Sequence, residues 1–421
     1  MSKIFFSLLS SMVVLSVWIP AAAEPVLIID HLLSEALEQN PEISAARKRL
    51  EAAREKIPQA GALDDPMLGL GVVNLPNNFD FNEEDMTMKE ISVSQKFPFP
   101  GKRSLMRAVA EKQADEVSGE VQETANQVVK NVKLTFYDLS HVYRAMEVTQ
   151  RNKEILEDFA RITQTRYSVG QGIQEDVIRV QVEISKMVDE LIMLEQRKKA
   201  LEARLNFLLR RPPASPLGAP EDFGFNRRKF TIEELQQRVL AENPVLKSIE
   251  HKIESRQKNL SLTNKDYLPD FSLKLAYGQR DDRLNMYTGM VEMNMPIFIK
   301  SKQDRKVAEA LAELQAEEAS YEATKNEFFY MIADMGSMAQ RLERQIELYT
   351  TGILPQASLQ INTAMSAYMV NRADFMTLLD SRMRLYRYEL EYHQALTEYE
   401  KSLASLETVV GVPFLRDEVI E

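Results

Sequence analysis

The chain contains the same pattern twice, and this internal repeat constrains the fold more than any other feature. "LSEALEQNPEISAARKRLEAAREK" near the start resembles "TIEELQQRVLAENPVLKSIEHKIESRQK" in the middle, which aligns Asn40-Pro41 with Asn243-Pro244. Further landmarks recur in the same order: Pro66 with Pro269, Pro98 with Pro296, Lys102 with Lys300, Tyr167 with Tyr368, and Pro212 with Pro413. Such an ordered series of matches indicates a tandem duplication.

Each copy is predicted to contain the same series of elements. Proline is accommodated in the first helical turn, so each Asn-Pro opens a helix, which ends before Pro66 or Pro269. The first repeat, residues 24–211, then has strands at 66–75 and 87–97, a long helix at 101–167, a tip at 168–173 and a return helix at 174–210. A linker at 212–230 leads to the second repeat at 231–412. This repeat has strands at 269–279 and 286–296, a long helix at 300–367, a tip at 368–373 and a return helix at 374–410. A tail at 413–421 follows.

The strand segments alternate in polarity. In "PDFSLKLAYG" the apolar side chains of residues 271, 273, 275 and 277 point to one side, because successive side chains of a strand point to opposite faces. Each segment has about ten residues, the length of a tilted transmembrane strand. A half-buried sheet on a soluble domain has the same alternation, so the strands alone leave both interpretations open.

The long helices favour the membrane interpretation. Between 102 and 166 there is one glycine, Gly119, and no proline, and apolar residues recur at the three- and four-residue spacing of a packed helical seam. Such a helix is on the order of 100 Å long, too long for an ordinary globular domain. We expect the shorter helix from Pro41 to stack on the return helix at 174–210, and 244–264 to stack on 374–410.

The junction between strand and long helix has a distinct sequence, "ISVSQKFPFPGKRS". Pro98 and Pro100 stop the strand, Gly101 lets the backbone bend, and Lys102 begins the helix. "MPIFIKS", with Pro296, is the second version of this junction and lacks the glycine.

Four membrane-length strands per chain cannot close a barrel. An open edge in lipid leaves backbone groups unpaired, at several kcal/mol each. The expected fold is therefore mixed α and β: a duplicated, long α-helical coiled-coil barrel, with strands that several copies pool around a rotation axis. The ring size does not follow from this argument.

The ends and the composition narrow the function. "MSKIFFSLLSSMVVLSVWIPAAAEP" reads as a secretory signal peptide over 1–23, cut after Ala23; a membrane anchor is the alternative, but the apolar run is short for one. The absence of cysteine excludes disulfides and thiol catalysis. A net charge of −11 argues against a nucleic-acid partner.

No motif indicates an enzyme, a cofactor or a metal site. "GLGVVN" lacks the third glycine of a dinucleotide fingerprint, and the four histidines are too scattered for paired metal ligands. Methionines gather around the strands at positions 67, 86, 88, 286, 290, 293 and 295. Thioethers suit soft ions such as Cu(I), but methionine is also an ordinary apolar filler, which we favour here.

On the duplication, the strand-to-helix junctions and the tips "YSVGQG" and "YMVNRAD", the whole mature chain resembles the TolC-like outer-membrane efflux channels. "SQKFPFPGKR" and "DDPMLGLGVVNLPN" look most like the branch that serves heavy-metal exporters of the resistance-nodulation-division (RND) type. The resemblance implies a homotrimer with a 12-stranded transmembrane β-barrel in the outer membrane of a Gram-negative bacterium and a helical tunnel across the periplasm. The implied partners are a periplasmic adaptor (membrane fusion) protein, an inner-membrane RND pump and outer-membrane lipid.

The resemblance also implies roles for the tips. Candidates for adaptor docking are Tyr167, Gly170, Gly172, Asp176 and Asn371, and candidates for the pore constriction are Tyr368, Arg372, Asp374 and Asp380. Gly170 and Asn371 also fit a plain left-handed helix end. Drug-efflux relatives carry two rings of aspartates; Asp380 matches one and Thr377 stands at the other, and a ring of carboxylates would attract cations.

Three functions stay open on the sequence. The first is an outer-membrane duct that exports heavy-metal cations, opened by an adaptor at its periplasmic tip. The second is the same duct for multidrug efflux or type I secretion. The third is a periplasmic coiled-coil scaffold with a soluble sheet.

Overall fold

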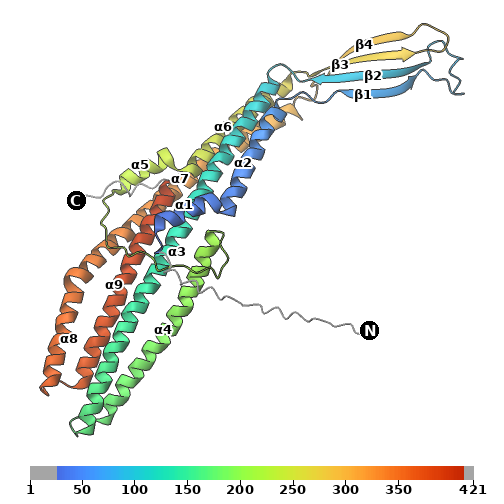
Figure 1. Ribbon diagram of the computed structural model, residues 1–421. Coiled ribbons are helices and arrows are strands. Elements are labelled where there is room, and N and C mark those ends of the chain that lie inside the picture. The colour runs from blue at the N-terminus through green and yellow to red at the C-terminus, as the bar shows by residue number, and fades with distance from the viewer. Residues whose placement is uncertain (1–25, 412–421) are drawn as a thin grey trace, which may run out of the picture.

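The computed structural model describes residues 26–411, so the predicted signal peptide (1–23) and the tail (413–421) lie outside the described part. The molecule is long: a sheet projects from one end of a helical bundle, and both helical hairpin tips lie at the other end (Figure 1). The first repeat comprises α1 (Ile29–Gln39), α2 (Pro41–Ala60), β1 (Met67–Val73), β2 (Met88–Phe97), α3 (Lys102–Ser168) and α4 (Gln174–Leu208). The second comprises α5 (Ile232–Glu242), α6 (Pro244–Asn264), β3 (Phe271–Gln279), β4 (Met286–Met293), α7 (Gln303–Leu348), α8 (Leu354–Met369) and α9 (Phe375–Val410).

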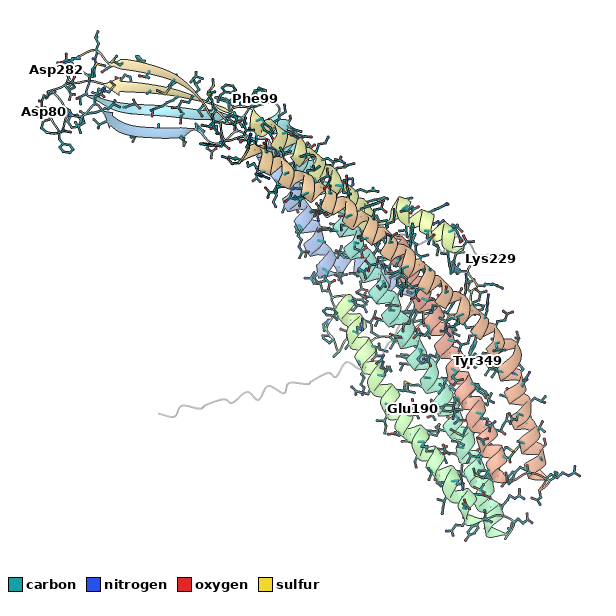
Figure 2. All side chains as sticks on the ribbon, turned by 180° about the vertical axis from the view of Figure 1, so that it is seen from behind. Asp80, Phe99, Glu190, Lys229, Asp282 and Tyr349 are labelled. Atoms are coloured by element: carbon teal, nitrogen blue, oxygen red, sulfur yellow. The ribbon has the colours of Figure 1, made fainter. Side chains whose placement is uncertain are left out.

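The four strands form one antiparallel sheet in the order β1-β2-β3-β4. The register sorts the side chains into two faces, because residues paired across strands point the same way. One row of the apolar face reads Leu70, Ile91, Tyr277, Tyr287, and one row of the polar face reads Gly69, Ser92, Ala276, Thr288. The loops that join the strands, marked by Asp80 and Asp282, lie at the end of the sheet away from the helices (Figure 2).

α3 runs without interruption from the junction to the tip. We call this helix the first rod. Its N-cap, Gly101, has φ 89°, a left-handed conformation that favours glycine. Much of the predicted seam is buried, including Val128, Val132, Phe136 and Leu139. α3 packs against α2 and α6 near the sheet and against α4 and α9 near the tips. It is the central element of the bundle.

An asparagine joins two helices end to end in each repeat. Asn40 caps α2, its Oδ1 accepting from the N–H of Glu42, and its Nδ2 donates to the carbonyl of Leu208 at the end of α4 (3.0 Å). Asn243 does the same for α6, donating to the carbonyl of Val409 at the end of α9 (2.6 Å). One buried amide thus satisfies the orphan groups of two helix ends. Short helices α1 and α5, which the sequence reasoning did not separate, end at these asparagines.

The second rod differs from the single helix that was predicted over 300–367. It consists of α7, a π-helical turn at Tyr349–Ile353, and α8. Pro355 follows the turn, and a proline in a regular helix removes one hydrogen bond and clashes with the preceding turn. The π turn falls where this conflict arises, and it was missed because Pro355 was not weighed. Tyr349 lies at the bend in the rod (Figure 2).

The linker between the repeats lies across the middle of the bundle. Leu27 forms an isolated parallel bridge with Pro220, so the start of the described chain pairs with the linker. Phe223 packs edge-on to Tyr137 of α3, and Phe225 packs on Tyr399 of α9. None of the helices within residues 26–411 is long and apolar enough to cross a membrane.

Candidate functional site: the helical tips

The two tips have the same backbone turn. Gly170 (φ 71°) and Asn371 (φ 58°) are both left-handed. In each tip two backbone N–H groups return to the last helical turn: Gly170 and Gln171 donate to Tyr167 and Arg166, and Asn371 and Arg372 donate to Tyr368 and Ala367. This is the Schellman type of helix end, which satisfies carbonyls that a plain end would leave exposed.

Arg166 ties the two tips together within one chain. Its guanidinium donates to the carbonyl of Tyr368 (3.1 Å) and to Oδ1 of Asn371, and it lies over the ring of Tyr368 at 4.6 Å. Sequence reasoning missed Arg166. It precedes the Tyr167 that was singled out, and its counterpart in the second tip is Ala367, so the repeat itself drew no attention to it.

Tyr368, a candidate for the constriction, is buried inside the chain. Its ring contacts Phe375 at the start of α9, and Phe375 contacts Phe159 of α3. The side chain therefore helps to hold the second hairpin on the first. Tyr167, its counterpart by the repeat, is exposed.

The carboxylates near the tips lie in different surroundings. Asp374 caps α9, accepting from the N–H of Thr377 (2.7 Å), and its hydrogen bonds with Thr377 hold its pKa below the usual range. Asp176 lies in the first turn of α4, where burial and then the nearby charges of Glu175 and Asp374 raise its pKa. A cavity of about 370 Å³ between the tips is lined by both aspartates and by Arg166.

Asp380 and Arg372 are exposed on the single chain. Asp380 forms an ion pair with Arg384 one turn further along α9 (2.7 Å). An exposed pair at this spacing contributes only a few tenths of a kcal/mol to stability. Gly172 approaches the backbone of the preceding turn closely, since an added Cβ would lie 3.3 Å from the nitrogen of Tyr167.

At the first strand-to-helix junction the predicted residues meet two aspartates. Lys102 is buried and its Nζ contacts Asp266 (3.2 Å) and Asp270 (3.0 Å). Asp270 also accepts from the N–H of Phe99 (2.9 Å), and these interactions lower its pKa despite its burial. Pro98 and Pro100 thus lead into a turn that is fixed to the segment between α6 and β3.

The second junction is open by comparison. Pro296 is half-buried, and Ile297 and Phe298 after it are exposed. Gln303 is buried at the start of α7, and within the described chain its Oε1 has no hydrogen-bond partner.

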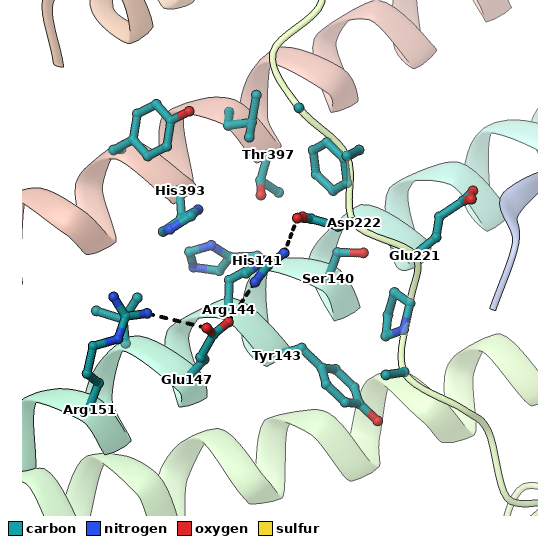
Figure 3. Close-up of a pocket in the computed structure, with 17 residues that line it drawn as sticks. Ser140, His141, Tyr143, Arg144, Glu147, Arg151, Glu221, Asp222, His393 and Thr397 are labelled. Carbon is teal, nitrogen blue, oxygen red and sulfur yellow. Dashed lines mark hydrogen bonds and ion pairs between the residues drawn. The ribbon is translucent and has the colours of Figure 1, made fainter. Parts of the chain in front are cut away.

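A cavity of about 650 Å³ lies between α3, α9 and the linker (Figure 3). His141 and His393 line it, and burial lowers the pKa of both. Arg144 contacts Asp222 of the linker and Glu147, which also contacts Arg151. These charges satisfy one another and hold the linker to the bundle. Among residues 26–411 no group of three or more His, Cys, Asp or Glu could hold a metal ion.

The comparisons with known proteins agree with this architecture. The family model described as "Outer membrane efflux protein" matches residues 32–209 and 235–412, which is one match for each repeat. The chain belongs to the outer membrane efflux protein family. This family consists of channels in the outer membrane, so the chain is an efflux channel of that membrane and not an enzyme.

Solved structures of outer-membrane channels share the fold. VceC from Vibrio cholerae is 16% identical, with 92% of this chain and 96% of VceC covered and a TM-score of 0.79. CusC is 16% identical, with 94% and 96% covered and a TM-score of 0.79. The open state of MtrE from Neisseria gonorrhoeae is 16% identical, with 92% and 90% covered and a TM-score of 0.75. A search of the curated proteins finds no match.

These findings confirm the predicted fold class: a tandemly duplicated, mostly helical chain with a four-stranded antiparallel sheet. The expected placement in the outer membrane is also confirmed. The scaffold alternative, a soluble periplasmic protein, was wrong, because the family is one of outer-membrane channels.

Proposed function

We propose that this channel is the outer-membrane component of a tripartite RND-type efflux system that exports heavy-metal cations. The observation that supports gated export is the link between the tips: one side chain, Arg166, joins both hairpins at the end where the chain would narrow. The metal assignment rests on the likeness of "SQKFPFPGKR" to the heavy-metal branch. Multidrug efflux or type I secretion is the alternative.

Self-assembly follows from flanks that a single chain leaves open. α3 packs against α2 and α6, whereas α7 packs against α6, α9 and the short α5, and among residues 26–411 no further long helix covers α7 as α2 covers α3. α4 and the second rod expose large apolar side chains on their outer sides: Ile178, Val182, Ile192 and Met193 on α4, and Leu311, Tyr330, Leu348 and Leu359 on the rod. α2 and α4 of a second copy would cover the flank of α7.

The same packing repeated around an axis closes a ring and pairs β4 of one copy with β1 of the next. Three copies, as the family resemblance implies, give twelve strands in a closed cylinder.

The repeat predicts one contact across this interface. Gly119 of α3 approaches Ser248 of α6, since an added Cβ would lie 2.9 Å from the Cβ of Ser248. The corresponding residues are Ala319 on α7 and Ala45 on α2, and both are exposed. Because the chain has no cysteine, Ala45→Cys with Ala319→Cys should yield covalent dimers and trimers on oxidation. Either single variant is the control, and a double variant that stays monomeric contradicts the interface.

For the gate, we infer that Arg166 holds the two tips together in the closed state and that adaptor contact releases it. The remaining candidates fall into three groups. Tyr368 and Asp374 hold the second tip, and Arg372 and Asp380 face outward on the single chain. The docking surface consists of Tyr167, Gly170, Gly172, Asp176 and Asn371.

Arg166→Ala should raise single-channel conductance, because the link between the tips is lost. Arg161→Ala is the control: Arg161 is an exposed arginine on α3 paired with Asp158, and its replacement should leave the conductance unchanged. Asp380→Ala should weaken block of the current by divalent cations.

Comparing a deletion strain's tolerance of metals with its tolerance of drugs tests the cargo. We expect sensitivity to copper, silver, zinc, cobalt or cadmium that returns to normal when the gene is supplied again. Normal metal tolerance with increased drug sensitivity would assign the channel to multidrug efflux instead.

A further inference from the structure

The methionines in the sheet are not scattered over both faces. Five lie within strands, at positions 67, 88, 286, 290 and 293. The register places four of them on the polar face, and only Met293 among them on the apolar face. Within the described strands, Val73 is the other large aliphatic residue on the polar face. The rest of that face is mostly glycine, alanine, serine, threonine, lysine and glutamate.

This distribution does not match apolar filling. A filler position accepts Leu, Ile or Val as readily as Met, and most positions of the apolar face hold Leu, Ile, Val, Phe or Tyr. On the polar face an exposed thioether gains nothing from burial; Met67, for example, is 71% exposed. The property that methionine has and the aliphatic residues lack is a sulfur lone pair.

Two of these methionines flank Gly278. A Cβ on residue 278 would lie 2.3 Å from Sδ of Met88, so the glycine leaves the space that this sulfur occupies. Met286 is paired directly with Gly278 across the β3–β4 ladder, and paired positions lie roughly 5 Å apart at Cβ. The neighbour of Gly278 on its other side is Glu90.

The charge at this place is already balanced. Glu90 forms an ion pair with Nζ of Lys274 (3.0 Å), so the pair of thioethers has a neutral carboxylate–ammonium unit beside it. Hard divalent cations take oxygen ligands, chiefly carboxylates, and the carboxylate of Glu90 beside Gly278 is already paired with Lys274. Soft monovalent cations bind thioether sulfur without a charged ligand.

We propose that Met88 and Met286 form a thioether site for a soft monovalent cation, Cu(I) or Ag(I), on the face of the sheet that lines the conduit. This inference rests on the proposed function and names the cation class. A site with two neutral ligands binds weakly, and a conduit needs binding that is strong enough for entry and weak enough for exit.

Met67 and Met290 extend the site toward the edges. They share a row with Ser94 and Lys274 and lie on the two edge strands, β1 and β4. When β4 of one copy pairs with β1 of the next, Met290 and Met67 come to adjacent strands on the same face. Each copy would then hold one pair of thioethers on its own sheet, Met88 with Met286, and share a second pair, Met290 with Met67, with the neighbouring copy.

Silver binding to the assembled, detergent-purified protein tests the site, with Ag(I) as the probe and isothermal titration calorimetry as the readout. The wild type should bind Ag(I), and M88L and M286L should each lower the affinity at least tenfold. M293L, on the opposite face of the same sheet, is the matched control and should bind as the wild type does. Leucine conserves the volume of methionine, so the variants keep their oligomer, which gel filtration checks.

Three results would overturn the site. The first is a wild type that binds no Ag(I), and the second is that the single variants M88L and M286L both bind Ag(I) as tightly as the wild type. The third such result is a loss of Ag(I) affinity in M293L as large as the loss in M88L and M286L. Failure of the proposed function is separable from failure of the site. Silver binding by the purified protein together with normal metal tolerance of the deletion strain would reject metal export and keep the site. Metal sensitivity without silver binding would reject the site and keep the export function.

Discussion

The two long rods descend from one duplicated sequence, yet one is continuous and the other is not. Above the π turn, buried residues of the rods match in pairs: Val132 with Ile332, Leu139 with Ala339, and Val142 with Leu342. Below it, Leu156 matches Ala357, one residue further along than the upper pairs predict. The second rod therefore carries one extra residue, and the π turn at Tyr349–Ile353 absorbs it.

The difference locates where the bundle can bend. A π turn is wider and less regularly bonded than an α turn, and here the hydroxyls of Thr350 and Thr351 also bond to backbone carbonyls. Tyr349 attaches the turn to α9 by donating to Glu391 (2.7 Å). Movement of the second hairpin is thus expected to centre on this turn, while the first rod stays rigid.

Introducing a proline into the first rod, at the position that corresponds to Pro355, should have the largest effect on the free energy of unfolding. Glu154 occupies the position of Pro355 by the lower alignment and is exposed in an uninterrupted helix. Glu154→Pro should cost about 3 kcal/mol or more of the free energy of unfolding, because α3 has no π turn to accommodate the ring. Urea unfolding followed by circular dichroism measures this. Glu154→Ala, which loses only the contact with Gln150, should be nearly neutral; equal loss in both variants would refute the argument.

The return helices should differ in the pH dependence of stability. Burial, with a smaller contribution from Glu407, raises the pKa of Glu400 in α9 to about 7, whereas the corresponding residue of α4 is the exposed Lys199. The folded state holds this proton more tightly than the unfolded state, so the free energy of unfolding falls as pH rises from about 4.5 to about 7 and is level above that. The loss should be on the order of 3 kcal/mol.

Glu400→Gln should remove most of this pH dependence and raise stability at pH 8. Denaturant unfolding at intervals between pH 4.5 and 8 checks it, with Lys199→Gln as the matched change on α4. A wild-type profile that Glu400→Gln leaves unaltered would count against the buried carboxyl.

The two asparagine joints should differ slightly. Asn243 accepts from two backbone N–H groups and Asn40 from one, and both donate to a carbonyl of the neighbouring helix end. Replacing either by alanine should cost about 1–2 kcal/mol, with Asn243→Ala the more costly by a few tenths. Asn→Asp at each position keeps the cap and loses the donated bond, which separates the two contributions in the same unfolding assay. Asn40→Ala as the costlier change would show that the extra accepted bond has no net effect.

Removing the proline from the second rod should change stability least. Pro355→Ala supplies an N–H where none existed, which favours a more regular turn, but alanine also raises the conformational entropy of the unfolded chain, so the net change in the free energy of unfolding should stay below about 1 kcal/mol. Hydrogen exchange of the amides at 349–353 should slow, while exchange in α3 stays the same. Unchanged exchange at the turn would show that the extra residue alone, without the proline, maintains it.

Sequence reasoning recovered the repeat, the four strands and the two long helical hairpins, because periodicity and the landmark prolines are local signals. It predicted turns at 168–173 and 368–373, close to where the long helices end in the structure, but it could not say which residues of the two tips touch. Arg166 reaches Tyr368 and Asn371 from the other repeat, about two hundred positions away, and no local pattern encodes that distance. Buried polar contacts such as Arg382 with Asn152 (2.7 Å) are invisible for the same reason.

The sequence by itself determined that this protein is a duplicated chain of membrane-length strands and very long helices, since alternation, helical spacing and helix-stopping residues act within a few positions. Only the tertiary structure decided how the two repeats pack together within the chain and where they differ. In each repeat one asparagine lies between two helix ends. The extra residue of the second rod is accommodated in a π turn, and four methionines lie on one face of the sheet. Each of these depends on which distant segments pack together, which is set by three-dimensional contact and not by neighbouring residues.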